Sequence, residues 1–385
     1  MNVKAFIKKY TMVIALVVVF IFFTVLTDGK LILAQNISNL LLQNAYVLVM
    51  ACGMLLCILT GGNVDLSVGS TLCLSAALAA KIMEKGNSPI VAIAVSLCVS
   101  VVIGIWQGWL IGYIHIPPFI CTLAGMFLFR GLARVVLDSK TISIMDKGFL
   151  NLFASYINIP GLDEKLKCKS ALFVGIAVAV ALMIYTIISV LKKKKNGYDT
   201  TSTVSQIAKM AVICLLIVFY SIKLYSYKGI PVMLVWILIV VLLFAFVTSS
   251  TVFGRYFYAV GGNEKATKLS GIDPRKVYFW AYFLMSFLAG FSGLLVAARI
   301  GSVDGNMGNS YEMDAIASCF IGGASAYGGS GNVPGIMVGA ILLGVINQGM
   351  SIYGLSDQWQ YVVKGAVLLV AVVFDVVSNH KTGKS

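Results

Sequence analysis

The residues best suited to polar chemistry lie in a glycine-rich interruption between two apolar runs, at positions 60–70. An ionisable side chain there needs a partner, a cavity or water, because exposure to hydrocarbon costs ~3 kcal/mol or more. Under one interpretation, Asn63, Asp65 and Ser67 lie where a polar solute passes. Under the other, Asp65 caps the helix that follows by accepting hydrogen bonds from the amides of Ser67 or Val68. We favour the cap, with the interruption itself still beside a pathway.

Arginines inside apolar runs are the second group of candidates. Arg130 and Arg134 lie one helical turn apart, and Arg299 ends another run. We expect them to pair with Asp138 or Asp314, or to extend toward the outer interface of a membrane. Direct contact with the hydroxyls of a substrate is the alternative.

Two amides, Asn347 and Gln348, lie in the middle of an apolar run, where a hydrogen bond between helices is more expected than contact with a ligand. Apart from Asp65, no predicted helix interior carries a carboxylate, so we do not expect a proton relay. The candidate pathway residues are Asn63, Asp65, Ser67, Arg130, Asp314, Asn347 and Gln348.

The chain has no pattern typical of a catalytic, metal or cofactor site. His115 and His380 are the only imidazoles, and the eight cysteines are scattered, mostly inside apolar runs. A second glycine-rich segment, 321–335, lacks the Gly-Lys-Ser/Thr ending of a phosphate-binding loop. We therefore expect no catalytic residue, no metal and no cofactor on this chain. These glycines are expected to allow close backbone packing and a tight turn between helices.

Composition indicates the class of protein. Of the 385 residues, 59% are hydrophobic and 11% are charged, against roughly 25% charged in soluble domains. The net charge of +14 comes largely from lysines clustered between apolar runs, which is typical of loops at anionic lipid and not of nucleic-acid binding. We predict an all-α polytopic membrane protein, because helices satisfy their own backbone hydrogen bonds in lipid.

About twelve membrane-spanning helices are expected, since most apolar runs approach the ~20 residues that a crossing needs. The runs are 11–27, 36–60, 66–83, 90–113, 119–137, 170–191, 207–224, 231–250, 277–298, 314–327, 333–353 and 360–377.

The distribution of lysine and arginine predicts the orientation. Lys4, Lys8 and Lys9 precede the first run, and no small-residue cleavage site follows it, so we expect an uncleaved first helix that starts inside. The densest lysine cluster, at 192–195, and the basic loop 254–276 then also lie inside. An even number of helices places both termini in the cytoplasm.

The organisation of the chain predicts an inverted repeat within a single transmembrane domain, 1–385. Four runs in 36–137 enter from outside and four in 277–377 enter from inside, an arrangement typical of transporters. Between them lie an extracytoplasmic loop, 138–169, an extra helical insertion, 170–230, and a cytoplasmic loop, 254–276.

The loop 254–276 carries the signals of a short helix. Asn263 can cap it, Ala266 and Leu269 are apolar and three residues apart, and Gly271 can end it. Either this basic loop lies on anionic lipid, or the helix is presented to a partner in the cytoplasm.

Four groups of motifs fall in order along nearly the whole chain. They are Leu59 to Ser70, Gly254-Arg255-Tyr256 with Gly271-Ile272-Asp273, Tyr311 to Ala317 with Ile321-Gly322-Gly323, and Trp359-Gln360 with Val363-Lys364-Gly365. At these residues the chain resembles the ribose/xylose/galactose-type membrane permeases of bacterial ATP-binding-cassette importers. The insertion 170–224 makes it similar to the xylose or multiple-monosaccharide permeases, with two helices beyond a ten-helix core of the type II importer kind. Asn63 is one residue more than the common Gly-Ile-Asp-Leu-Ser motif has.

The resemblance implies a multi-pass protein of the bacterial cell membrane that does no covalent chemistry itself. Its implied partners are a second copy of the permease, a cytoplasmic ATPase with two nucleotide sites for ATP and Mg, and an extracytoplasmic sugar-binding protein. The implied substrate is a monosaccharide of the xylose, galactose, glucose, arabinose or ribose class. A coupling helix that docks on the ATPase would comprise Arg255, Gly262, Asn263, Glu264, Ala266, Leu269 and Gly271.

Two alternatives remain open. Permeases for nucleosides or other small polar solutes share the same importer architecture. A stand-alone secondary transporter driven by an ion gradient is the other possibility, and it predicts uptake without an ATPase partner.

Overall fold

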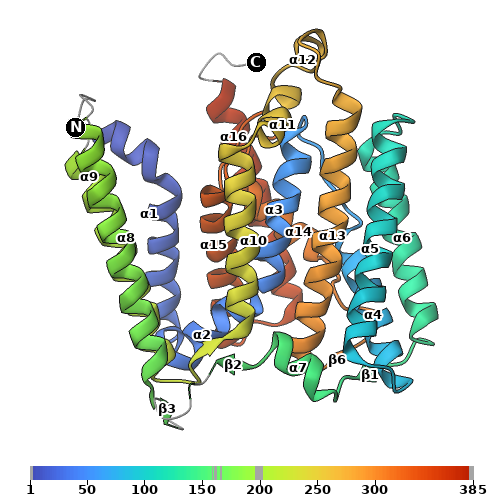
Figure 1. The fold of residues 1–385 in the computed structure, drawn as a ribbon, viewed down its shortest axis with the longest axis horizontal. Helices are drawn as coiled ribbons and strands as arrows, with labels where there is room; N and C mark the ends of the chain where they lie inside the picture. Colours follow the sequence, from blue (N-terminus) through green and yellow to red (C-terminus); the bar gives the residue numbers. More distant parts are fainter. Residues whose placement is uncertain (1–2, 158, 160–162, 165–166, 196–202, 381–385) are drawn as a thin grey trace. The chain divides into compact units, whose positions relative to one another are not determined.

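The computed structural model describes residues 3–157, 159, 163–164, 167–195 and 203–380. Within these residues the chain is dominated by helices, and each predicted apolar run contains one (Figure 1). The long elements are α1 (Val3–Leu26), α2 (Ala34–Gln43), α3 (Ala45–Leu59), α4 (Val68–Glu84), α5 (Pro89–Gly112), α6 (Pro118–Val136), α8 (Lys169–Lys195), α9 (Thr203–Tyr225), α10 (Val232–Ser250), α13 (Pro274–Ile300), α14 (Tyr311–Ile321), α15 (Val333–Tyr353) and α16 (Asp357–His380).

Short elements connect these helices. They are the 3-10 turn η1 (Lys30–Ile32), helices α7 (Lys147–Phe153), α11 (Val252–Gly262) and α12 (Glu264–Leu269), and strands β1 (Ile142–Ser143), β2 (Tyr156–Ile157), β3 (Asp163–Glu164), β4 (Lys167–Cys168), β5 (Ile230–Pro231) and β6 (Ser302–Val303). The strands form three antiparallel pairs among the described residues: β1 with β6, β2 with β5, and β3 with β4.

The predicted all-α polytopic class is confirmed. Seven helical segments in the described part of the chain are long and apolar enough to cross a membrane by themselves. Shorter apolar stretches lie in α1 and α9, at Met12–Leu26 and Met210–Tyr225. The total of twelve crossings stays a prediction.

Helix α14 is shorter than its apolar run predicts. It has 11 residues and ends at Ile321, and positions 322–327 form turns. At 1.5 Å per residue it is ~16 Å long, about half the ~30 Å hydrocarbon core of a bilayer. The glycines that follow it explain the early end, because Gly323 and Gly328 have positive φ angles of 87° and 85°.

The chain divides into two compact units. Unit 1 comprises Met1–Asp28, Leu40–Ala154 and Met233–Ser385, and unit 2 comprises Gly29–Asn39 and Ser155–Val232. In unit 2, α8 packs against α9, and Tyr156 pairs with Pro231 in the β2–β5 ladder. Positions 196–202, which follow the lysine cluster at 192–195, lie outside the described residues.

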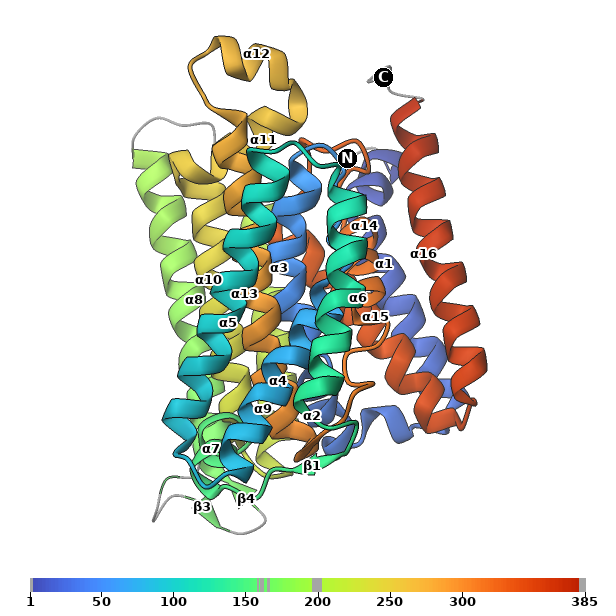
Figure 2. The same cartoon turned by 90° about the vertical axis from the view of Figure 1, so that its right-hand side faces the viewer.

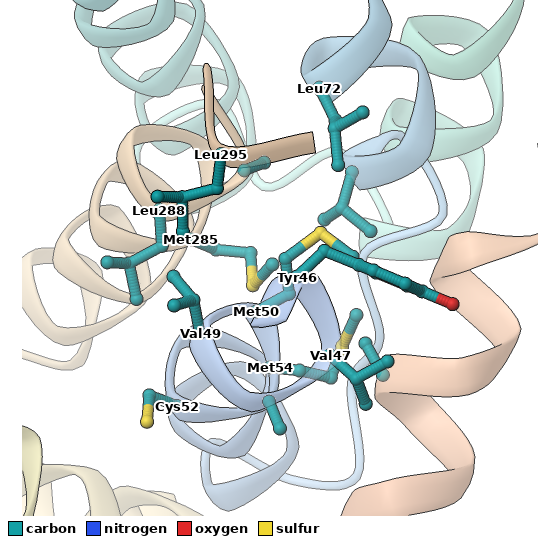
Figure 3. Packing of buried hydrophobic residues seen from close by; sticks show 14 of the residues in the cluster. Tyr46, Val47, Val49, Met50, Cys52, Met54, Leu72, Met285, Leu288 and Leu295 are labelled. Carbon is teal, nitrogen blue, oxygen red and sulfur yellow. The ribbon is translucent and has the colours of Figure 1, made fainter. Parts of the chain in front are cut away.

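Helix α3 is the centre of unit 1. Every residue from Ala45 to Leu59 is buried, as expected for a helix that is apolar on all sides and surrounded by other helices. Figure 3 shows its side chains among Met285 and Leu288 of α13 and Leu72 of α4. The backbones of α3 and α13 approach closely at Gly53, where a Cβ atom would lie 2.8 Å from Met285 Sδ.

A stripe of small residues brings α5 against α13. Gly104, Gly108 and Gly112 are spaced four residues apart, so they lie on one face of α5. A Cβ atom at Gly108 would lie 2.7 Å from the carbonyl oxygen of Phe279, and one at Gly112 would lie 2.6 Å from that of Arg275. Small residues at membrane helix interfaces allow this close backbone packing.

The two ends of unit 1 differ. The start of α1, the end of α16 and the short helix α12 lie at one end, and the β1–β6 pair lies at the other (Figures 1 and 2). Helix α13 joins them with 27 residues, a length of ~40 Å. The observed placement of α1 and α16 is the one that an even number of crossings predicts.

We expect Gly62→Ala to lower the melting temperature of the detergent-solubilised protein. Gly62 has a φ of 76°, and a Cβ atom there would overlap the carbonyl oxygen of Ala326. Gly86→Ala is the matched control, because Gly86 has a φ of 80° and no atom within 4 Å of a Cβ. The control isolates the backbone strain of ~1–2 kcal/mol. Equal losses for the two variants would contradict the close packing at Gly62.

Candidate functional site

The first interruption lies between the end of α3 at Leu59 and the start of α4 at Val68. Asp65 is fully buried there, and its Oδ1 accepts hydrogen bonds from the Ser67 amide at 2.8 Å and the Ser67 hydroxyl at 2.7 Å. The amide bond is the one that the capping interpretation predicts. Asp65 Oδ2 is also buried and accepts no hydrogen bond from the described residues. Asn63 turns back, and its Nδ2 donates to the Thr60 carbonyl at 3.3 Å.

A buried polar chain extends from this interruption across two further helices. Gln107 of α5 donates from Nε2 to Ser67 Oγ at 2.9 Å, and its Oε1 accepts from Ser286 Oγ of α13 at 3.1 Å. All three side chains are buried, so each bond replaces one that water would otherwise supply. Gln107 is not among the candidate residues predicted from the sequence. Its signal was an amide inside an apolar run, flanked by Gly104 and Gly108.

The second glycine-rich segment meets the first. The amide of Gly329 donates to the carbonyl of Leu59 at 3.0 Å. Cβ atoms would not fit between the two segments, because one at Gly328 would lie 2.5 Å from Gly61 Cα. The close packing and tight turn predicted for 321–335 are confirmed.

Helix α11 is the third segment at this junction. A Cβ atom at Gly261 would overlap the Leu59 carbonyl and lie 2.6 Å from the Gly329 amide nitrogen. Tyr258 donates from its hydroxyl to the Gly331 carbonyl at 3.0 Å. The end of α11 therefore touches the backbone of both glycine-rich segments.

Helix α12 is the short helix that the sequence predicts. Asn263 Oδ1 accepts from the Ala266 amide at 2.9 Å, and Gly271 follows the helix with a φ of 84°. Ala266 is exposed, and Leu269 is 90% exposed. An apolar side chain this exposed at the tip of a capped helix is available to a partner.

Two side chains fasten α12 to its neighbours. Thr267 is buried and donates from Oγ1 to the Ala259 carbonyl of α11 at 2.8 Å. Glu264 Oε2 accepts from the Tyr278 hydroxyl of α13 at 3.0 Å. Asp273 caps the start of α13, and the guanidinium of Arg275 in the first turn donates to its carboxylate and lowers the pKa of that carboxyl below its usual value. A hollow of about 460 Å³ lies beside α12 and is lined by Glu264, Lys268, Asp273, Arg275, Tyr278 and His115, among others.

The predicted coupling residues lie on α11, on α12 and at the turn that follows α12. Asn263, Glu264, Ala266 and Leu269 share α12 and its cap, and Gly271 ends it. Arg255 is exposed on α11, one helix earlier. Gly262 ends α11 and has nothing within 4 Å of a Cβ position.

The predicted pairing of arginine with aspartate is wrong. Asp314, at the start of α14, accepts a hydrogen bond at 2.6 Å from the Tyr46 hydroxyl and pairs at 3.0 Å with Lys364 of α16. Asp314 is 2% exposed, and the Tyr46 ring stacks on Tyr311 with centroids 3.7 Å apart. Asp138 pairs with Lys81 at 3.2 Å. Lysines on other helices reach these carboxylates, so the arginines serve elsewhere.

Two of the arginines hold the α13–α14 connection. Arg130 donates to the carbonyl of Met307, and Arg134 donates from Nη2 to Asn306 Oδ1 at 3.2 Å. These bonds join α6 to a loop more than 170 residues later in the chain. They leave a cavity of about 170 Å³ beside Glu312.

Only some of the candidate pathway residues lie close to one another in the structure. Asp65 and Ser67 bond to each other, whereas Arg130 and Asp314 lie on opposite sides of the first turn of α14, in separate cavities. Asn347 and Gln348 lie on α15. Asn347 Oδ1 is buried and accepts no hydrogen bond from the described residues. The hydrogen bond between helices expected for these two amides stays a prediction. No group of three metal-ligating side chains occurs in the described part of the chain.

Interrupted helices that pack around buried polar groups, inside a bundle of apolar helices, define a polytopic membrane permease. Comparison with known proteins identifies the family. The model of the family described as "branched-chain amino acid transport system / permease component" matches residues 36–372, and the chain belongs to this family. No solved structure matches the chain.

Curated relatives align over nearly the whole chain. The xylose transport system permease protein of Haemophilus influenzae is 33% identical over 375 residues, 97% of each chain. The ribose import permease protein of Escherichia coli is 31% identical over 373 residues, 97% of this chain and 95% of its own. The ribose import permease protein of Bacillus subtilis is 32% identical over 342 residues, 88% of this chain and 84% of its own. The motif-based resemblance to sugar permeases is confirmed.

We expect Lys364→Met to destabilise the protein by about 3–5 kcal/mol, because it leaves the buried Asp314 carboxylate without its cation. Lys81→Met is the control, since Lys81 pairs with the exposed carboxylates of Glu84 and Asp138 and its loss costs about 0–1 kcal/mol. Thermal unfolding in detergent measures both.

The double variant Lys364→Met/Asp314→Asn should recover part of the loss, because the unpaired charge is gone. A loss in the double variant equal to the sum of the two single losses would show that the pair is not coupled.

Proposed function

We propose that this chain is the permease subunit of an ATP-binding-cassette importer for a monosaccharide. In this proposal two copies form the pathway, a cytoplasmic ATPase supplies the energy, and an extracytoplasmic binding protein delivers the sugar. Family membership and relatives that transport xylose and ribose support the substrate class. The observation that carries the mechanism is the backbone contact of α11 with both glycine-rich segments.

The exposed face of α12 is the proposed docking site for the ATPase. Its apolar side chains Ala266 and Leu269 are exposed, and no other described residue covers them. The cap at Asn263 stabilises the helix even when no partner protein is bound. Charged groups around the neighbouring hollow, Lys268 and Arg275 among them, form a polar rim. An apolar centre with a polar rim is the usual anatomy of a protein interface.

Movement of α12 would reach the centre of the permease through α11. Thr267 bonds α12 to α11, and Gly261 of α11 lies against Leu59 and Gly329 without intervening side chains. A displacement of α11 therefore has to move the ends of both interruptions, because closely packed backbone atoms cannot be compressed to absorb the movement. ATP binding drives the change to the extent that the ATPase docks more tightly on one state than on the other.

This assignment also sets the orientation. If α12 meets an ATPase, its end of unit 1 is cytoplasmic, and the start of α1 and the end of α16 lie there too (Figure 2). The β1–β6 end is then extracytoplasmic and faces the binding protein.

We expect Leu269→Arg to abolish co-purification of the ATPase with the tagged permease, because a charge replaces the most exposed apolar side chain of α12. Uptake of labelled sugar by cells should fall at least tenfold, while the amount of permease in the membrane is unchanged. Met145→Arg is the matched control for co-purification of the ATPase: Met145 is 83% exposed but lies between β1 and α7, at the opposite end.

Normal recovery of the ATPase with Leu269→Arg would refute the docking assignment. Sugar uptake by the permease alone, into vesicles that contain no ATP, would refute the importer mechanism and favour a gradient-driven carrier.

A further inference from the structure

A small cavity lies where α6 faces the connection between α13 and α14. Its volume is about 170 Å³. Five polar side chains converge on it: Arg130, Arg134, Asn306, Asn309 and Glu312. Met126 and Phe127 complete the lining on the side of α6.

The depth of this cavity is given by the helices that build it. It lies beside the connection that follows α13, and this connection leaves α13 at the end of unit 1 opposite α12, where β6 pairs with β1. In the proposed orientation that end is extracytoplasmic. The connection then turns back along α4, since a Cβ atom at Gly308 would lie 2.5 Å from the Gly69 carbonyl oxygen. The cavity also lies at the start of α14, a helix only ~16 Å long whose other end meets the glycine-rich junction. Transporters commonly place solute sites beside discontinuous or half-length helices.

The loop side of the cavity is held in a fixed shape. Arg130 donates to the Met307 carbonyl and Arg134 donates to Asn306 Oδ1, so both guanidinium groups are anchored to the connection that they face. On the opposite side, the Glu312 carboxylate packs against Gly69 of α4, where a Cβ atom would overlap it. A cavity with pre-positioned polar groups is the usual form of a small-molecule site.

The chemistry of the lining selects the kind of ligand. Guanidinium and amide groups donate hydrogen bonds, and the Glu312 carboxylate and the asparagine oxygens accept them. A neutral polyol needs both kinds of partner at neighbouring hydroxyls, and the apolar side chains of Met126 and Phe127 suit the C–H face of a sugar ring. An anion would meet the Glu312 carboxylate, and the arginines are already bonded to the loop. The volume lies below the ~300–1,000 Å³ of sites for drug-sized ligands, which suits a single ring.

We infer that this cavity is an extracytoplasmic subsite that binds one monosaccharide ring on its way from the binding protein into the pathway. This inference rests on the proposed function and adds a location and a set of residues to it. Asn309 and Glu312 contact the hydroxyl groups, and Arg130 and Arg134 position the loop.

The test is saturation-transfer NMR of the full-length permease in nanodiscs, without the binding protein, with D-xylose or D-ribose at millimolar concentration. We expect transfer from the protein to the sugar that falls at least fivefold in Asn309→Leu and in Glu312→Gln. Glu84→Gln, which changes an exposed carboxylate outside the cavity, is the matched control and should leave the transfer unchanged. Melting temperatures identify any variant that fails to fold.

The wild-type protein alone also tests the inference. No transfer to either sugar, or stronger binding of the anionic sugar acid D-xylonate than of D-xylose, would overturn it, as would undiminished transfer in both variants. Co-purification of the ATPase and ATP-dependent uptake are measured on the same preparations. If these persist while the cavity binds no sugar, the subsite is wrong and the importer function stands; if they fail in the wild type, the importer function itself is wrong.

Discussion

Direct contact between backbones at Gly261, Leu59 and Gly329 is the constraint on which the proposed coupling between α12 and the centre of the bundle depends. Glycine at these approaches removes the side chains that would separate the segments, and one hydrogen bond, from the Gly329 amide to the Leu59 carbonyl, joins the two glycine-rich segments directly. No side chains lie between the end of α11 and the two glycine-rich segments at this contact. In the proposed mechanism, docking at α12 and rearrangement at the centre of the bundle are therefore coupled by geometry.

The buried polar groups follow from the same architecture. Helices that end inside the bundle leave backbone and side-chain groups that lipid cannot satisfy, so other protein groups or water must supply their hydrogen bonds. Asp65 bonds to Ser67 and through it to Gln107, and Asp314 bonds to Tyr46 and Lys364. Asp65 precedes α4, and Asp314 lies in the first turn of the short helix α14. A helix that begins or ends inside the bundle can shift without breaking the backbone hydrogen bonds of a long continuous helix. These positions suit a pathway that must open and close.

Local features were predictable from the sequence, and long-range pairs were not. The cap at Asn263, the amide bond to Asp65 and the tight glycine turns depend on residues within a few positions of one another, so spacing alone indicates them. Lys364 lies 50 residues from Asp314, and Tyr46 lies 268 residues away. Residue spacing carries no information on contacts this far apart in the chain. We therefore expected arginines to pair with Asp314, whereas its cation is Lys364. The four-residue spacing of Gly104, Gly108 and Gly112 was visible and would have placed α5 against another helix.

The most direct test of the coupling account is to measure distances between spin labels in the reconstituted permease and its ATPase, with and without ATP. Labels at Lys268 of α12 and Tyr327 of the second glycine-rich segment report on the junction, and a third label at Lys140 marks the opposite end. We expect the distance between Lys268 and Tyr327 to stay constant when ATP binds, while the distances from both to Lys140 change together. A change between Lys268 and Tyr327, with Tyr327 unmoved relative to Lys140, would contradict the account.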